Sequence, residues 1–310
     1  MKGVILSLDR SSDSVALSAL LVERFYCMRK SFNDFVQWKG THAPRASECY
    51  QVVLNRFDTY IGSKIEICEA DYTAFIYSEQ ARVSGTTMNG VISALKGLAR
   101  YLHDTRQSDV PPSLIRHLRY APKQRVFVTK ADLGQLMDSL NMQSVWEVRK
   151  ALCLSLLWDT GIRVSELIGL NLGDIDLQSR TACIRTKKNH QFRYIQWGDA
   201  THSLLVKYLG VRVCVDTNND ALLLSITTNQ RVTPRSVQRW IEEIRIKSHI
   251  NKKISPHSFR HGKAHAMLGM GATVKDIQVV LGHSETNPRA AFQYLRLNED
   301  EQRQILRRFV

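Results

Sequence analysis

Between Ser255 and Tyr294, the sequence marks where three short helices begin and end. Ser255 is a favourable residue for the position before a helix, and Pro256 suits the first helical position. Glycines end this helix and also the next one, which covers Val274–Leu281. Pro288 starts a third helix that carries Tyr294. This stretch is therefore predicted to fold as short helices joined by tight turns.

These helices and turns carry side chains that suit chemistry on a phosphate. His257 and Arg260 are three residues apart, so they share one face of their helix. His283 follows a glycine that ends a helix, and Tyr294 is the only tyrosine in the last hundred residues. A reaction at a phosphodiester needs cationic groups that hold the phosphate, a proton donor and a nucleophile. The stretch offers all three.

The charge of the chain points to the class of partner. A formal charge of +14 and a sequence pI of about 9.6 favour a polyanion, most often a nucleic acid. The hydrophobic fraction of 44% is ordinary for a soluble protein, and 310 residues are enough for two domains. The six cysteines form no C-x-x-C pair, which argues against a metal cluster or a disulfide framework. With neither a signal peptide nor a membrane-length apolar run, we expect a cytoplasmic protein.

Residues 1–105 are predicted to form a helical domain that binds core DNA, with a loose leader at 1–13. Apolar residues recur at helical spacing in four segments, which are 14–37, 48–60, 70–80 and 86–103. Four such helices make a small bundle. Basic residues are spread over several of them. They could form a solvated face or a clamp on a duplex backbone, and this half alone does not decide between the two.

Residues 106–126 are predicted to be a basic linker. Three prolines within it prevent one continuous helix. A basic connector between two basic domains could follow a phosphate backbone. The candidate DNA contacts in the linker are Arg116, Arg119, Lys123 and Arg125.

Residues 127–310 are predicted to form a second domain of mixed α and β structure. Trp146–Thr160 is strongly apolar and is expected to be a central buried helix. The runs Arg180–Thr186 and Phe192–Trp197 predict a β-hairpin. Residues 298–310 have the spacing of an amphipathic tail helix. The predicted fold class is therefore mainly α, with a small β-sheet or hairpin in the C-terminal domain.

Five parts of the sequence carry these candidate residues in a fixed order. They are the box Thr160-Gly-Ile-Arg-Val-Ser-Glu-Leu167, the hairpin, the boxes Pro256-His-Ser-Phe-Arg-His261 and Leu281-Gly-His-Ser284, and Tyr294. In this order they resemble the tyrosine recombinases, the family of phage integrases and Xer-type recombinases. The resemblance covers roughly residues 127–296, while the N-terminal bundle matches only in size, helical character and position. It implies a helical DNA-binding bundle followed by a catalytic domain.

The resemblance also implies a role for individual residues. Arg163 and Arg260 would hold the scissile phosphate, since guanidinium groups offer forked donors and keep their charge at any working pH. Tyr294 would be the nucleophile. His257 would act as a general acid or base, and His283 would donate a hydrogen bond to the phosphate.

By the same resemblance, the hairpin would supply a lysine that protonates the departing 5′-oxygen. Lys187 fits this position, but Lys188 is adjacent, and neighbouring strand residues face opposite sides. We favour Lys187 as the acid and treat Lys188 and Arg193 as DNA contacts. Glu166, one helical turn after Arg163, would orient the basic groups.

Several of these residues also have plainer interpretations. Arg163 could be a surface arginine paired with Glu166, and Tyr294 could be a core aromatic residue. His257, His261 and His265 have helical spacing that could mimic a metal-binding face, but no cysteine or carboxylate completes such a site, so no metal is expected. The eleven residues from His283 to Tyr294 are two more than the family pattern has, and a turn before Tyr294 would absorb them.

The function that follows is site-specific DNA recombination through a 3′-phosphotyrosyl intermediate and a Holliday junction. The resemblance implies four copies of the chain acting on two double-stranded core sites, without a cofactor. An integrase or resolvase of a mobile element or replicon is the expected setting. The alternatives are a DNA strand transferase resembling type IB topoisomerases, and a DNA-binding regulator that has lost catalysis.

Overall fold

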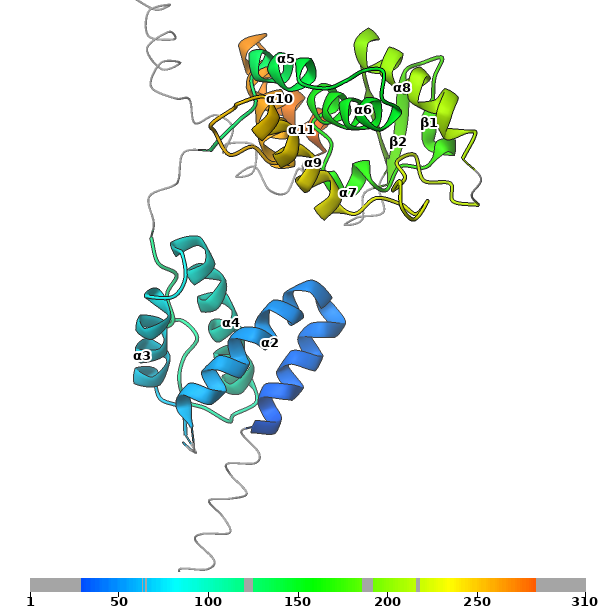
Figure 1. Ribbon diagram of the computed structural model, residues 1–310. Helices are drawn as coiled ribbons and strands as arrows, with labels where there is room; N and C mark the ends of the chain where they lie inside the picture. The colour runs from blue at the N-terminus through cyan, green and yellow to red at the C-terminus, as the bar shows by residue number, and fades with distance from the viewer. Residues whose placement is uncertain are drawn as a thin grey trace, which may run out of the picture. The chain divides into compact units, whose positions relative to one another are not determined.

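The computed structural model describes residues 29–62, 64, 66–119, 125–185, 192–215 and 218–282. The chain divides into two compact units, Met1–Pro122 and Lys123–Val310, and each is described by itself (Figure 1). In the described ranges the structure is mainly helical, with a small antiparallel sheet in the second unit. The predicted fold class is thus confirmed.

The first unit packs its helices around aromatic side chains. A helix over residues 29–42 is followed by α2 (Pro44–Ile61), α3 (Glu69–Gln80) and α4 (Gly85–Asp104). Phe57 lies in the core, stacked on Tyr72 and edge-on to Phe75. Residues 14–28 of the first predicted helix lie outside the described residues.

The segment that follows α4 has no regular structure, but it packs against the first unit. The side chain of Asn89 accepts a hydrogen bond from the backbone N–H of Leu118 (2.9 Å) and donates one to its carbonyl (3.0 Å). Ile115 is only 3% exposed and lies in the core of this unit. Arg116 and Arg119 remain exposed beside these anchored residues. Much of the predicted linker therefore packs on the bundle, which places two candidate DNA contacts on the surface of the first unit.

The second unit is built around α6. Its helices are α5 (Lys130–Asp138), α6 (Val145–Thr160), α7 (Val164–Leu167), the 3-10 turn η1 (Leu172–Asp174), α8 (Asp199–Arg212), α9 (Pro234–Lys247), α10 (Pro256–Gly269) and α11 (Val274–Leu281). Every residue from 151 to 157 is buried, as the apolar sequence of this helix predicts. The core extends from α6 to Leu205 of α8 and Phe259 of α10. None of the described helices is both long and apolar enough to span a lipid bilayer.

The predicted hairpin is present as two strands of a three-stranded sheet. In the described residues, β1 (Ile175–Asp176), β2 (Thr181–Arg185) and β3 (Phe192–Gln196) pair antiparallel in that order. Because strand side chains alternate, Ile195 faces the core while Tyr194 is exposed. The segment after residue 220 forms single bridges from Ala221 to Asn171 and from Leu224 to Arg231.

The helix ends predicted between residues 255 and 282 are confirmed. Ser255 precedes α10, and its backbone N–H donates to the hydroxyl of Ser258 (3.1 Å). Thr273 caps α11 by accepting a hydrogen bond from the N–H of Asp276 (3.2 Å). Gly282 ends α11 in the left-handed conformation, with φ of 63°, which a glycine adopts without steric cost.

Candidate active site

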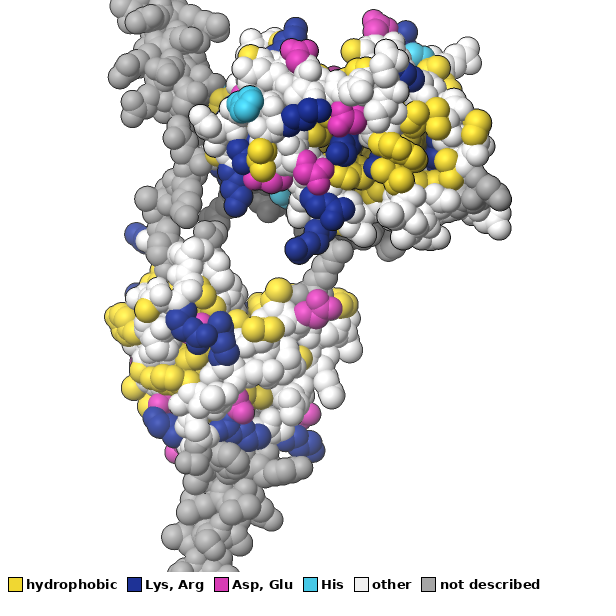
Figure 2. Space-filling model, in the orientation of Figure 1, with side chains coloured by type: hydrophobic (Ala, Val, Ile, Leu, Met, Phe, Trp, Pro, Cys, Tyr) yellow, Lys and Arg dark blue, Asp and Glu magenta, His cyan; other side chains and the backbone are white. Residues whose placement is uncertain are grey.

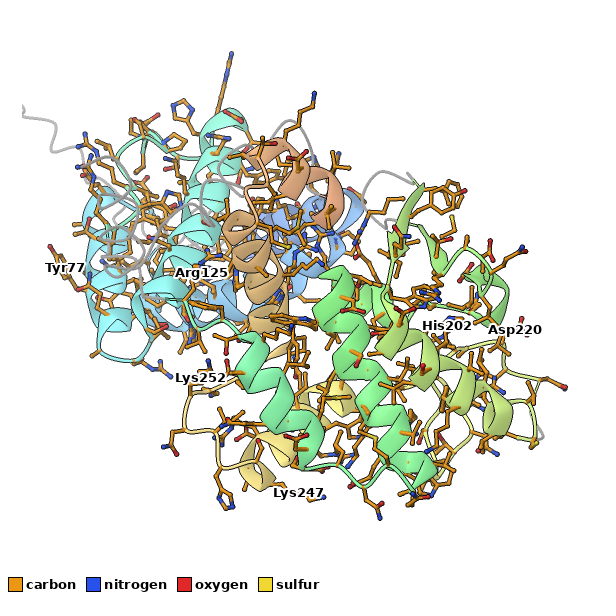
Figure 3. All side chains as sticks on the ribbon, turned by 90° about the horizontal axis from the view of Figure 1, so that it is seen from above. Tyr77, Arg125, His202, Asp220, Lys247 and Lys252 are labelled. Atoms are coloured by element: carbon orange, nitrogen blue, oxygen red, sulfur yellow. The ribbon has the colours of Figure 1, made fainter. Side chains whose placement is uncertain are left out.

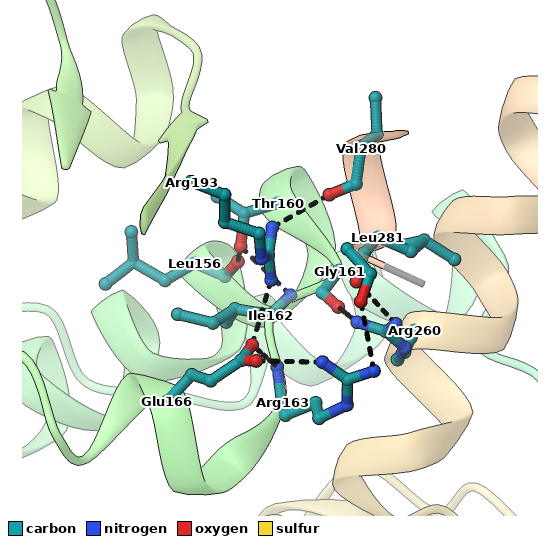
Figure 4. A network of polar contacts seen from close by, with 11 residues as sticks. Leu156, Thr160, Gly161, Ile162, Arg163, Glu166, Arg193, Arg260, Val280 and Leu281 are labelled. Carbon is teal, nitrogen blue, oxygen red and sulfur yellow. Dashed lines mark hydrogen bonds and ion pairs between the residues drawn. The ribbon is translucent and has the colours of Figure 1, made fainter. Parts of the chain in front are cut away.

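Arg260 is a buried arginine at the centre of the second unit. It lies on α10, is 3% exposed, and donates to the carbonyl of Gly161 (2.8 Å) and to that of Leu281 (2.6 Å). Gly161 ends α6 and Leu281 is the last residue of α11. A single guanidinium therefore fixes the end of α11 against α6 and α10 (Figure 4).

Arg163 approaches the same turn from the start of α7. Its Nη1 contacts Oε1 of Glu166 at 2.8 Å, and its backbone N–H donates to Oε2 at 3.0 Å. Its Nη2 donates to the carbonyl of Gly282 at 3.3 Å. The side chain remains 37% exposed, so part of the guanidinium is open to a ligand. The plain interpretation of Arg163 as a helix-surface partner of Glu166 accounts for only some of these contacts.

Arg193, a predicted DNA contact, has a mostly buried side chain that pairs with residues of α7 and α11. Its side chain on β3 is 12% exposed, with Nη2 at 2.8 Å from Oε2 of Glu166 and Nη1 at 2.8 Å from the carbonyl of Val280. Strand alternation puts it on the inward face of β3 with Ile195. Nη1 and Nη2 of Arg193 thus both contact protein atoms, and its contact with DNA stays a prediction (Figure 4).

Glu166 is a buried carboxylate of α7 that pairs with Arg193 of β3. Its side chain is 7% exposed. Burial raises its pKa, but the charges of Arg193 and Arg163 and the hydrogen bonds from Arg163 outweigh this, so the net pKa lies below its ordinary value. Glu166 is thus held ionised between two arginines, and its role in orienting them stays a prediction.

His257 lies on the exposed face of α10, one turn before the buried Arg260 side chain. Partial loss of water around the ring, followed by the charges of Arg260, Arg163 and Arg125, lowers its pKa. The ring is therefore neutral near pH 7 and able to accept a proton. Arg163 and Arg260 therefore meet at the turn formed by residues 281 and 282, and the charges of both act on His257.

The segment before α5 runs alongside α10. The N–H of Val128 donates to the carbonyl of Ser258 (3.0 Å). Nη1 of Arg125, a residue labelled in Figure 3, lies 3.5 Å from Nε2 of His261. Burial and the charges of Arg125, His257 and Arg260 lower the pKa of His261 to about 4. The ring of His265 stacks on Phe127, with centroids 4.1 Å apart. In the described residues, no group of three histidines, cysteines or carboxylates could hold a metal ion.

Some predicted site residues fall outside the described ranges, namely Lys123, Lys187, Lys188, His283 and Tyr294. Two relationships between described residues were missed from the sequence. One is the contact of Arg193 with Glu166, which strand alternation signals by placing Arg193 on the inward face. The other is the close approach of Arg193 to Gly282, which no local pattern indicates.

A family model described as "Phage integrase family" matches residues 126–301. A curated tyrosine recombinase of Thermosipho africanus is 27% identical over 278 residues, covering 87% of this chain and 95% of that protein. Tyrosine recombinase XerC of Listeria innocua is 27% identical over 274 residues, covering 83% of this chain and 89% of its own length.

Solved structures share the fold. XerH recombinase bound to a palindromic difH substrate superposes with a TM-score of 0.72 at 19% identity, covering 84% of this chain and 78% of the other. A lambda integrase dimer bound to a COC′ core site superposes with a TM-score of 0.69 at 16% identity, covering 86% and 76%. These identities are low, so the two structures bear on the fold alone.

Proposed function

Since this chain belongs to the phage integrase family and is a tyrosine recombinase, we propose that it cuts and rejoins duplex DNA through a covalent bond between Tyr294 and a 3′-phosphate. The phenolic oxygen of Tyr294 attacks phosphorus while the bond from phosphorus to the 5′-oxygen breaks. His257 accepts the phenolic proton, and Lys187 donates a proton to the departing 5′-oxygen. A free 5′-hydroxyl from a second strand then reverses these steps and releases the enzyme.

The observation that carries this proposal is the convergence of Arg163 and Arg260 on residues 281 and 282. Arg260 reaches the carbonyl of Leu281, and Arg163 reaches that of Gly282, immediately before His283 in the sequence. Two fixed guanidinium groups suit the extra negative charge of a pentacoordinate phosphorus, because donors that are already oriented need no reorganisation during the reaction. The exposed part of the Arg163 guanidinium and the neutral ring of His257 remain accessible to a phosphate.

The partner that we propose is double-stranded DNA with specific core sites. The net charge of +14 suits a polyanion, and lysine and arginine side chains lie on both units in the view of Figure 2. XerH, lambda integrase and the Tn1549 transposon integrase, which share this fold, were solved with DNA. We further propose four copies on two sites, exchange through a Holliday junction, and a role on a mobile element or replicon.

The test is to trap and map the covalent complex. The full chain is incubated with nicked fragments of the replicon that carries its gene, and DNA attached to denatured protein is recovered and sequenced. We expect a recurrent pair of cleavage positions between inverted repeats, with the nucleotide on the peptide that contains Tyr294. The Tyr294→Phe variant should bind the same fragments and form no adduct.

The outcomes separate the competing functions. Cleavage at scattered positions with relaxation of supercoils would indicate a topoisomerase. Specific binding with no adduct from the unaltered chain would indicate a regulator without catalysis. Attachment of the nucleotide to any residue other than Tyr294 would overturn the proposed mechanism.

A further inference from the structure

One arginine outside the predicted catalytic set connects three segments of the second unit. Arg193 extends from β3 to Oε2 of Glu166, near the start of α7, and to the carbonyl of Val280 in α11, both at 2.8 Å. These segments are far apart in sequence, and each leads to a residue that the proposed function uses (Figure 4). Glu166 holds Arg163, and the chain continues from Val280 to His283.

The contact between Arg193 and the end of α11 is close. A Cβ atom built on Gly282 would lie 2.6 Å from Nε and 2.7 Å from Cδ of Arg193. Such distances are shorter than non-bonded atoms allow, so only a glycine leaves room for this side chain. The guanidinium therefore packs directly against the backbone that precedes His283.

The two carboxylate oxygens of Glu166 accept hydrogen bonds from different donors. Oε1 accepts from the guanidinium of Arg163, while Oε2 accepts from the backbone of Arg163 and from Arg193. A bond from Arg193 to Oε2 restricts rotation of the carboxylate, and so fixes where Oε1 holds Arg163. Without Arg193, a carboxylate that is 7% exposed would keep one charged partner instead of two.

We propose that Arg193 is a positioning residue of the recombinase site, which orients Glu166 and the turn at 280–282 so that Arg163 presents its open edge to the scissile phosphate. This inference rests on the proposed function. Arg193 does not touch DNA; it acts through Glu166 and through the backbone of α11.

The alternative is that Arg193 only stabilises the fold, and the chain contains a matched control for that role. Arg245 on α9 contacts both oxygens of Glu242 (2.9 and 2.8 Å) and donates to the carbonyl of Ile250 (2.5 Å). Like Arg193, it joins a glutamate to a backbone carbonyl and is mostly buried, at 19% exposure. Its contacts within the described residues, to Glu242 and Ile250, include no residue of the candidate site.

The experiment compares Arg193→Gln, Arg193→Lys and Arg245→Gln in the full chain. The substrate is a nicked duplex that contains the cleavage site mapped as described above. For each variant, the thermal midpoint, the affinity for this duplex and the rate of adduct formation are measured from pH 5 to 9. Failure of the unaltered chain to form the adduct would refute the proposed function, whereas the inference is judged only from variants against a reactive parent.

We expect Arg193→Gln to bind the duplex within about threefold of the parent but to form adduct about 100-fold more slowly, the size of effect that a small misplacement of a reacting group produces. Arg245→Gln should leave the rate unchanged and lower the thermal midpoint by less than Arg193→Gln does, because Glu242 is 46% exposed. Arg193→Lys should recover part of the rate, since an ammonium can pair with Glu166 but cannot also reach Val280.

The pH profile separates positioning from simple stabilisation. Glu166 is faced by Arg163 from α7 and by Arg193 from β3, and burial acts against its ionised form. Removing Arg193 should raise the pKa of Glu166, so Arg193→Gln should lose activity at a higher pH than the parent as the solution is acidified. Arg193→Lys, which keeps the charge, should show the parent's acid limb.

Two results would overturn the inference. One is an adduct rate for Arg193→Gln within threefold of that for Arg245→Gln across the pH range. The other is a slow Arg193→Gln enzyme with an unshifted acid limb. If Arg193→Gln does not unfold cooperatively, the Arg193→Lys variant decides the test. A parental rate of adduct formation in Arg193→Lys would show that the contact of Arg193 with Val280 contributes nothing to that rate.

Discussion

Arg260 donates to the carbonyl of Leu281 across 2.6 Å, so the arginine of α10 is fixed to the last residue of α11. The same guanidinium donates to Gly161 at 2.8 Å. A buried arginine whose donors meet backbone carbonyls is held in one orientation before any ligand arrives. We therefore regard Arg260 as both a structural link and a preformed half of a phosphate site.

We predict that Arg260→Lys separates these two contributions. An ammonium cannot reach both carbonyls, so one buried acceptor loses its partner, at a cost of about 1–3 kcal/mol in the free energy of unfolding. Adduct formation should also slow by about 100-fold or more, as when a fixed donor is removed from an oxyanion site. Urea unfolding and single-turnover adduct formation measure the two effects.

The control for this prediction is Arg231→Lys. Arg231 donates to the carbonyls of Ile168 (2.7 Å) and Leu170 (3.0 Å), and so resembles Arg260 in its bonding. Its substitution should reduce stability comparably and leave the adduct rate at the parental value. Equal slowing in both variants would mean that Arg260 matters only for the fold.

A second prediction concerns the glycine that ends α11. Gly282→Ala places a side chain on a residue with φ of 63° and against Arg193. Gly271→Ala places one at φ of 88° with no atom within 4 Å, so it imposes the backbone strain without the contact. Both should lose about 1–2 kcal/mol of unfolding free energy. Only Gly282→Ala should also slow adduct formation, by about tenfold or more, since it displaces Arg193. Indistinguishable rates would contradict the close packing of Arg193.

The sequence carries strong local signals for much of this structure. The ends of α10 and α11 follow from Ser255, Thr273 and Gly282, and the pairing of Arg163 with Glu166 follows from helical spacing. These features depend on neighbours within four residues, and so a single sequence specifies them.

Features that depend on distant residues were predicted less well. The packing of Ile115 and Leu118 on the first unit was not predicted, because two prolines and several charged residues surround this short apolar group. The contacts of Arg193 with Glu166 and Val280 were not predicted, although strand alternation places this side chain inward. A charged residue at an inward position is informative only once its partner is known, and Glu166 is 27 residues away.

A third prediction concerns stability in acid. The pKa of His261 is lowered from 6.5 to about 4, chiefly by burial and then by Arg125, His257, Arg260 and His265. Between these two values the unfolded chain binds a proton that the folded chain does not, so stability is complete above pH 6.5 and falls as pH drops towards 4. Allowing for solvent screening of a partly exposed ring, we expect His261 to contribute a loss of roughly 1 kcal/mol between pH 7 and 5.

His261→Gln tests this contribution. It should reduce the loss of unfolding free energy between pH 7 and 5 relative to the parent, as measured by urea unfolding at both values. His249→Asn, an exposed histidine beyond the end of α9, should leave the loss unchanged. An identical decline in the parent and in His261→Gln would show that other groups account for it.

A fourth prediction concerns the exposed arginines that follow α4. Arg116 and Arg119 flank the anchored Leu118, so their side chains are held at the surface of the first unit. If each neutralises one phosphate, its change to Gln should weaken binding to all duplexes alike and reduce the salt slope of log affinity by about 0.9. Fluorescence anisotropy from 50 to 300 mM salt measures this slope. Arg82→Gln, an exposed arginine paired with Glu79, is the control, and an unchanged slope for Arg116→Gln and Arg119→Gln would remove them as DNA contacts.

The last prediction decides between the two hairpin lysines, which lie outside the described residues. The proposed acid protonates a 5′-oxygen, whereas a 5′-sulfur departs without that help because a thiol has a pKa of about 8.5. Lys187→Ala should therefore slow adduct formation on the ordinary duplex by about 100-fold or more, and react at the parental rate on a duplex with sulfur at the 5′-bridging position. Lys188→Ala should lose affinity and show the same modest change on both duplexes. Rescue of Lys188→Ala by sulfur, with none for Lys187→Ala, would reverse the assignment. An equal deficit of Lys187→Ala on both substrates would mean that this residue donates no proton to the leaving group.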